Sequence, residues 1–255
     1  MNVTRLLLVG TWLQLKMRSR SAFDGLLSII YPLFFATTIF LMFRQGRSSA
    51  LVDAAVGASA MGVWSAVSTT ASTALQSERR QGTLELLVAS PTAFPLIVVP
   101  ITLSMAIGGL WSLVATLLWG RWVFGIDVRI DDPLGFTSAA VATALSIALV
   151  GYLLAVSAVR YRSAWALGTA FELPVWLICG FLIPIADLPP WVRPISWLLP
   201  PTWGVSAIHA AAAGQPPWDD MAVCLLVGLA YASLATLLSV RLLRSARSAA
   251  TLSLT

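Results

Sequence analysis

Residues 77–91 have the sequence SERRQGTLELLVASP and form a charged stretch between two long apolar segments. Gly82 follows the charges and can end a preceding helix, because glycine tolerates the positive φ angles found at helix ends. Thr83 is suited to capping a new helix, which Pro91 would end after about one and a half turns. The stretch therefore predicts a break between two membrane spans, with a short helix at the membrane boundary. Its apolar face would dock either in a protein groove or on lipid.

The composition places the chain among integral membrane proteins. Of its 255 residues, 58% are hydrophobic and only 11% are charged, whereas about 25% of the residues in a soluble domain are charged. The apolar residues form blocks of about 20, long enough for a helix to cross a hydrocarbon core roughly 30 Å thick. We therefore predict an all-α integral membrane protein with six transmembrane helices. These helices are expected at residues 25–43, 50–75, 94–120, 134–159, 164–186 and 221–243.

Basic residues indicate how the chain lies across the membrane. With the N-terminus in the cytoplasm, eleven of the 16 Lys and Arg residues fall on the inner side and most acidic residues fall outside. This distribution follows the positive-inside rule, so both termini are expected in the cytoplasm. The net charge of +5 reflects this topology, and no basic soluble face indicates nucleic-acid binding. The first apolar segment is too long for a cleavable signal sequence.

Residues 1–255 are expected to form one transmembrane domain. Its N-terminal part, residues 1–24, carries Leu8, Trp12 and Leu15 on one helical face and basic residues on another. This pattern is typical of a helix lying in the inner membrane interface, with an ordinary basic tail as the alternative. The other parts are the first five spans (25–186), an outer region (187–217), and the sixth span with a cytoplasmic tail (218–255).

Small residues recur every four positions along the second span. In lipid, small side chains let helix backbones approach closely, so this span is expected to be buried. It would lie between other helices, against a second protomer, or along a transport pathway. Ser65 and Thr69 are its candidate pathway residues. The small residues are Ala54, Ala58, Gly62, Ala66, Thr70 and Ala74.

Residues 184–217 hold eight of the 14 prolines and three of the 11 tryptophans. So many prolines exclude one continuous helix, yet the segment is too apolar for a free outer loop. Broken helices inserted partly from outside would reconcile these facts, provided that protein covers the irregular backbone.

Glu172 lies within the expected fifth span, two residues before Pro174. An acid inside the membrane is costly and is a candidate functional residue by default. We expect Glu172 either to pair with an arginine such as Arg162 or to act on substrate or a proton, and Pro174 to kink the helix. Both residues are therefore candidates for the pathway.

Metal or catalytic chemistry is not indicated. Cys179 and Cys224 are expected to be buried free thiols, because free cysteine behaves as a small hydrophobe. No pair of residues has zinc-ligand spacing. His209 is the only histidine and has no second ligand type nearby, so we expect it to be solvated or capped.

Two motifs carry a resemblance to a known family. The sequence ERRQGTLELL at 78–87, followed by Ser90 and Pro91, resembles the inner-loop motif of type-2 ABC exporter permeases. The stretches GFLIP at 180–184, LPPW at 188–191 and LPPTW at 199–203 resemble the second landmark of that family. Their order and the six-span plan agree with the resemblance, which covers nearly the whole chain.

The resemblance implies roles for particular residues. The short inner helix would be a coupling helix that contacts a separate ATP-binding subunit, and the N-terminal helix would lie at the same contact. The outer broken helices would close the external mouth. The coupling residues would be Glu78, Arg80, Gly82, Thr83, Leu84, Glu85 and Leu87. The outer gate would comprise Pro184, Trp191, Pro200 and Trp203.

The resemblance also implies partners and a location. Two permease protomers, identical or different, would face each other in lipid above two ATP-binding subunits, in a bacterial-type cell membrane. The chain has no Gly-x-x-x-x-Gly-Lys-Ser/Thr loop, so ATP and Mg are expected on the partner subunits and this chain is not expected to be an enzyme. A hydrophobic or amphipathic drug-like molecule or lipid is the expected cargo. Export of a lipid-linked glycan, or an ATPase-independent carrier or channel, is the alternative.

Overall fold

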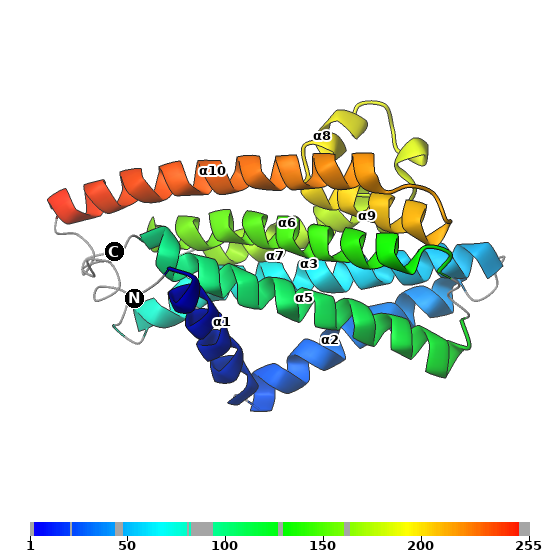
Figure 1. The fold of residues 1–255 in the computed structure, drawn as a ribbon, viewed down its shortest axis with the longest axis horizontal. Helices are drawn as coiled ribbons and strands as arrows, with labels where there is room; N and C mark the ends of the chain where they lie inside the picture. The colour runs from blue at the N-terminus through cyan, green and yellow to red at the C-terminus, as the bar shows by residue number, and fades with distance from the viewer. Residues whose placement is uncertain are drawn as a thin grey trace.

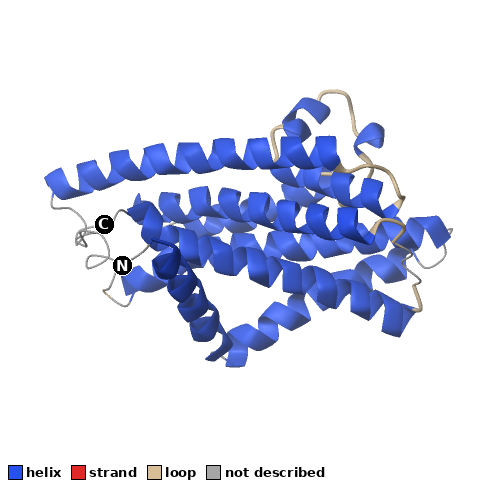
Figure 2. Ribbon diagram, in the orientation of Figure 1, coloured by secondary structure: helices blue, strands red, loops and turns tan. Residues whose placement is uncertain are grey.

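The computed structural model describes residues 3–20, 22–43, 48–80, 82, 94–126, 130–160 and 164–249. Within these ranges all regular secondary structure is helical (Figure 2). The helices are α1 (Val3–Arg20), α2 (Ala22–Phe43), α3 (Ser48–Arg80), α5 (Phe94–Phe124), α6 (Pro133–Arg160), α7 (Ala164–Ile178), the 3₁₀ helix η1 (Ile185–Asp187), α8 (Arg193–Trp197), α9 (Pro200–Ala212) and α10 (Trp218–Ala249).

The long helices α3, α5, α6 and α10 run along the long axis of one bundle (Figure 1). Helix α3 packs against α5, α6, α2 and α7, so it lies at the centre, whereas α10 packs mainly on α6 and α9. The end of α3, the start of α5 and the end of α10 lie toward one end of the bundle, and α8 and α9 lie toward the other (Figure 1). The sequence analysis expects these two ends on the inner and outer sides of the membrane, and that orientation stays a prediction.

Three helical segments are long and apolar enough to cross a membrane: Leu96–Phe124, Pro133–Ser157 and Trp218–Arg241. They coincide with the third, fourth and sixth expected spans. Helices α2, α3 and α7 occupy the positions of the other three. The prediction of an all-helical chain is thus confirmed for the described residues, while the crossing by α2, α3 and α7 stays a prediction.

The fifth helix is shorter than the sequence analysis predicts. Helix α7 ends at Ile178 rather than at Ala186, and turns and bends occupy residues 179–183. Gly180 has a φ angle of +81°, which side-chain-bearing residues rarely adopt, so the helix stops there. Pro184 then precedes a separate 3₁₀ turn. Cys179 and Phe181 in this run are buried although they are not helical, and the carbonyl of Phe181 lies against Gly57 of α3.

The second span is longer than expected. Helix α3 continues to Arg80 instead of ending near Leu75, so Glu78 and Arg80 are helical. The break falls at Gly82, which is exposed and has a φ angle of +72°. The predicted helix end at this glycine is therefore confirmed. The other coupling residues, Thr83, Leu84, Glu85 and Leu87, lie outside the described residues.

The N-terminal helix is present, as the sequence predicts. Helix α1 packs against α5 and α2, and its Leu8 and Trp12 side chains are exposed apolar groups. Arg5 and Lys16 are exposed as well. Such a helix suits a membrane interface, although its location in the membrane stays a prediction.

Candidate functional site

The face that α7 turns toward the bundle carries the only charged side chain that is buried among the described residues. Glu172, Val175, Trp176 and Cys179 are buried and recur at helical spacing. Phe171, Leu173 and Leu177 on the other face are exposed. Because the buried positions follow i, i+3, i+4 and i+7, they form one stripe. The boundary between this stripe and α3 is called the α3–α7 seam below.

A close backbone contact sets the level of the two helices in the seam. A β-carbon on Gly57 of α3 would overlap the carbonyl oxygen of Phe181, just beyond α7. Helices α3 and α7 are antiparallel (Figure 1). On moving away from this contact, residue numbers therefore rise along α3 and fall along α7. Counting along both at about 1.5 Å per residue places Glu172 at the level of residues 65–69, to within about a turn. The pathway candidates Ser65, Thr69 and Glu172 therefore lie at a similar depth.

Glu172 lacks a basic partner within the described part of the chain. Its side chain is only 6% exposed, and Oε1 has no hydrogen-bond partner among the described residues. In the described side chains of α2, α3 and α6, the charged or titratable groups are Asp53 and Tyr152. Asp53 lies at the outer end of α3, and Arg193 of α8 donates hydrogen bonds to backbone carbonyls. Arg162, the predicted partner, lies outside the described residues.

Aromatic rings lie on the same stripe as this acid and on the neighbouring helices α2 and α3. The Trp176 ring lies one helical turn from Glu172 and meets Phe35 of α2 edge to face, with ring centroids 4.7 Å apart. Trp64 of α3 is also buried. The Nε1 atoms of both tryptophans have no hydrogen-bond partner among the described residues. The seam thus combines a carboxylate with indole rings, a combination that attracts cations.

Some of the buried hydroxyl groups in the bundle bond locally, whereas those of Ser112, Thr116 and Tyr152 have no hydrogen-bond partner among the described residues. Ser59, Ser104 and Thr143 donate hydrogen bonds to carbonyl oxygens of their own helices. The carbonyl oxygen of Ser65 accepts a bond of 3.4 Å from the Ser68 hydroxyl. Pro174 is exposed, so it faces away from the seam; it lies inside α7, which is continuous from Ala164 to Ile178, and the kink stays a prediction. The side chain of Thr69 is outside the described set.

Hydrogen bonds tie the outer helical pieces to the end of α7. The Ser196 hydroxyl donates to the carbonyl of Ile178 at 2.6 Å, and Thr202 donates to the carbonyl of Ser196 at 2.6 Å. The Trp203 indole donates to the carbonyl of Trp197. These bonds connect α7, α8 and α9, as expected for broken helices whose backbone is covered by protein.

The four predicted gate residues differ in how far they are buried. Pro200 is buried at the start of α9, where a proline is favoured, and its carbonyl accepts a bond from the Cys224 thiol. Trp203 is half-buried. Pro184 is exposed, and Trp191 is 74% exposed. Pro200 and Trp203 therefore belong to the packed outer region, whereas Trp191 projects from it.

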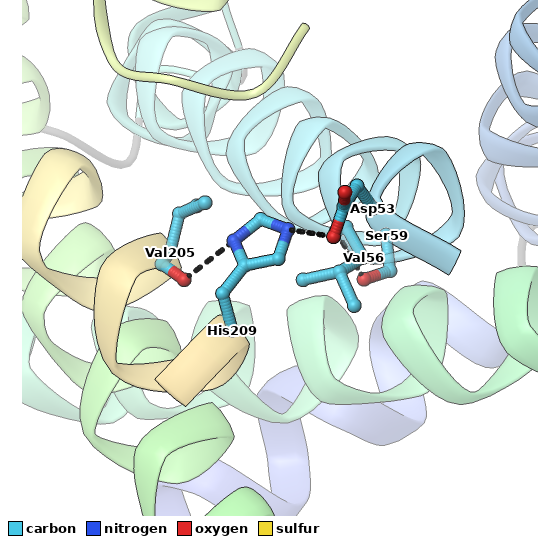
Figure 3. Close-up of polar contacts among 5 residues, drawn as sticks. All are labelled: Asp53, Val56, Ser59, Val205 and His209. Carbon is cyan, nitrogen blue, oxygen red and sulfur yellow. Dashed lines mark hydrogen bonds and ion pairs between the residues drawn. The ribbon is translucent and has the colours of Figure 1, made fainter. Parts of the chain in front are cut away.

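One polar contact between α3 and α9 was not foreseen from the sequence (Figure 3). Nδ1 of His209 lies 3.0 Å from the carbonyl oxygen of Val205, and Nε2 lies 3.8 Å from Oδ1 of Asp53. Asp53 is 72% exposed, so this pair contributes at most about 1 kcal/mol. The residues are 156 positions apart, and no local pattern could have paired them. The capped histidine itself agrees with the prediction.

Metal binding has no visible basis in the part of the chain that the structure describes. No group of three or more His, Cys, Asp or Glu residues there is suited to hold a metal ion. Cys179 and Cys224 are free and fully buried, as predicted.

Long apolar helices packed into one bundle define this chain as a multi-pass membrane protein. The family model described as ABC-2 type transporter matches residues 5–212, and the chain belongs to this family. It is therefore a membrane permease component, from a family of transport subunits that lack an ATPase domain and that work with an ATP-binding subunit. A comparison with curated proteins finds no match.

Proposed function

We propose that the chain is the permease subunit of an ATP-driven exporter of a hydrophobic or amphipathic molecule. The cargo would be drug-like or a lipid, taken from the cytoplasm or the inner leaflet. The observation that carries this choice is the buried interior, where Glu172 is the only charged side chain among the described residues. An interior with so little charge suits an apolar cargo body.

Coupling to ATP would involve the segment that follows α3. We propose that residues 83–88 contact the ATP-binding subunit, that two such subunits bind ATP and Mg, and that a second protomer completes the complex. Closure of the ATP-bound subunits would push on this segment and tilt the attached spans. Such coupling requires that ATP bind the two states of the complex with different affinity.

Export of a lipid-linked glycan is the second candidate function. A glycan needs many free donors and acceptors along its path. Ser59, Ser104 and Thr143 bond within their own helices. The buried hydroxyls of Ser112, Thr116 and Tyr152, which have no partner among the described residues, are few for such a path. The hydrophobic cargo is therefore preferred.

A photo-crosslinking experiment tests the proposal. A photoreactive amino acid would replace Glu85, and a matched control would replace Gln215, which is exposed in the outer region. In native membranes, position 85 should capture a nucleotide-binding protein and position 215 should not. Capture of lipid alone from position 85 would contradict the coupling role and favour an autonomous carrier or channel.

A further inference from the structure

We propose that the α3–α7 seam binds the positively charged group of the cargo, so that the exported molecules are lipophilic cations. This inference rests on the proposed function and adds the charge of the substrate to it. The cation would lie between the Glu172 carboxylate and the rings of Trp176 and Trp64.

The first argument is the cost of Glu172 where it lies. A carboxylate that is 94% buried loses its hydration, and the loss must be offset by a paired charge or several hydrogen bonds. Oε1 has no hydrogen-bond partner among the described residues, the described side chains of α3 and α6 include no basic group, and Arg193 of α8 donates to backbone carbonyls instead. A cation supplied from outside the chain would offset this cost.

The second argument is the surroundings of the acid. Trp176 follows Glu172 by one turn on the same buried stripe, and Trp64 is buried on the facing helix α3. Indole rings bind cations over their faces more strongly than other aromatic rings do, and the contact strengthens when water is excluded. The small side chains of α3 at this depth leave its backbone accessible to close approach.

The third argument is selectivity by charge. Asp53 is the one charged group in the described side chains of α3, and Asp131, Asp132 and Asp220 lie beside α9, to which they are hydrogen-bonded. A cation that leaves the seam toward this end meets no described lysine or arginine on α3, α6 or α9, and the one basic residue there, His209, lies against Asp53. Anions of the same size would be disfavoured along the same route.

The test measures binding to the purified permease in a non-ionic detergent, without the ATP-binding subunit. The probe is radiolabelled tetraphenylphosphonium, and tetraphenylborate is the matched ion of nearly equal size and opposite charge. We expect the wild-type chain to bind the cation more tightly than the anion. Glu172→Gln should weaken cation binding about tenfold or more, and Trp176→Phe about two- to fivefold. Glu172→Asp keeps the charge and should retain most of the binding.

Asp187→Asn is the control, because it removes the same charge at an exposed position, and it should leave binding unchanged. Competition by short-chain phosphatidylcholine, but not by phosphatidylglycerol, would identify a lipid headgroup as the source of the cation. Absence of competition would identify a free organic cation. Equal binding of both probes by the wild-type chain would overturn the proposal. Lower thermal stability of Glu172→Gln with unchanged cation binding would also overturn it, in favour of pairing within the chain.

The two proposals fail separately. A seam that binds cations in a chain without an ATPase crosslink at position 85 would keep the site and remove the coupled exporter. A crosslink without Glu172-dependent binding would keep the exporter and remove the cation.

Discussion

At the scale of single residues, the contact between Gly57 and Phe181 is the tightest constraint on the seam. A β-carbon at position 57 would overlap the carbonyl oxygen and approach the carbonyl carbon of Phe181. We expect Gly57→Ala to force the segment after α7 away from α3, with a loss of about 1–3 kcal/mol in stability. The apparent melting temperature of the purified chain measures this loss. Ala230→Val adds bulk at an exposed position of α10 and is the control.

An unchanged melting temperature of Gly57→Ala would contradict the close approach and the depth assigned to Glu172.

The sequence identified several site residues but not their neighbours. Glu172 is recognisable because an acid in an apolar run is costly, which is a property of one residue in its local context. Which helix faces it, and the contact between Trp176 and Phe35, depend on how α3 and α2 are placed in the bundle, and small-residue spacing predicts burial without naming the partner helix. For the same reason the approach of His209 to Asp53 had no signal in the sequence.

At the scale of elements, Ser196 joins the end of α7 to the outer helices. Its fully buried hydroxyl donates to the carbonyl of Ile178, which has lost its helical donor because α7 ends there. We expect Ser196→Ala to lower the stability by about 0.5–1.5 kcal/mol. Ser233→Ala removes a bond to the carbonyl of Leu229 within its own exposed helix surface and should have a smaller effect. Equal melting temperatures of the two variants would argue against a stabilising role for the hydrogen bond between Ser196 and Ile178.

The coupling segment, residues 83–88, belongs to the same scale, because the sequence predicts a short helix there. Glu85→Arg would reverse the charge of one proposed coupling residue, so ATP-driven export should fall to background while the protein still inserts in the membrane. Uptake into inside-out vesicles with and without ATP measures this. Gln215→Arg adds the same charge in the outer region and should transport normally. Normal coupled export by Glu85→Arg would refute the coupling assignment.

The helix boundaries show where sequence patterns stop being informative. Hydropathy places an element well, but it does not distinguish a helix from an apolar turn that packs against its neighbours. The fifth span was therefore predicted to reach Ala186, whereas Gly180 ends α7 at Ile178. The expected span stops at Leu75, where the apolar residues end, but Glu and Arg are good helix formers outside the lipid, so α3 continues to Arg80.

At the scale of the whole molecule, the short α7 determines how many times the chain crosses the membrane, and this number sets the side on which the C-terminus lies. Its 15 residues span only about 22 Å as a helix, less than the roughly 30 Å of a hydrocarbon core. The turns at 179–183 and the outer helices extend this path, and α10 then returns along the bundle toward the end where α3 stops (Figure 1). Six crossings put both termini in the cytoplasm, whereas five would put the C-terminus outside.

Cysteine labelling in intact cells distinguishes these topologies. Cys179 and Cys224 are fully buried, so the wild-type chain should react little with a membrane-impermeant maleimide. Gln215→Cys should be labelled from outside, because position 215 is exposed in the outer region. Gln81→Cys and Ser253→Cys should react only after permeabilisation. Labelling of Ser253→Cys in intact cells, with Gln81→Cys still protected, would mean that α7 does not cross the membrane. The seam would then have to open to the inner side, and Glu172 would meet its cargo before the cargo enters the membrane.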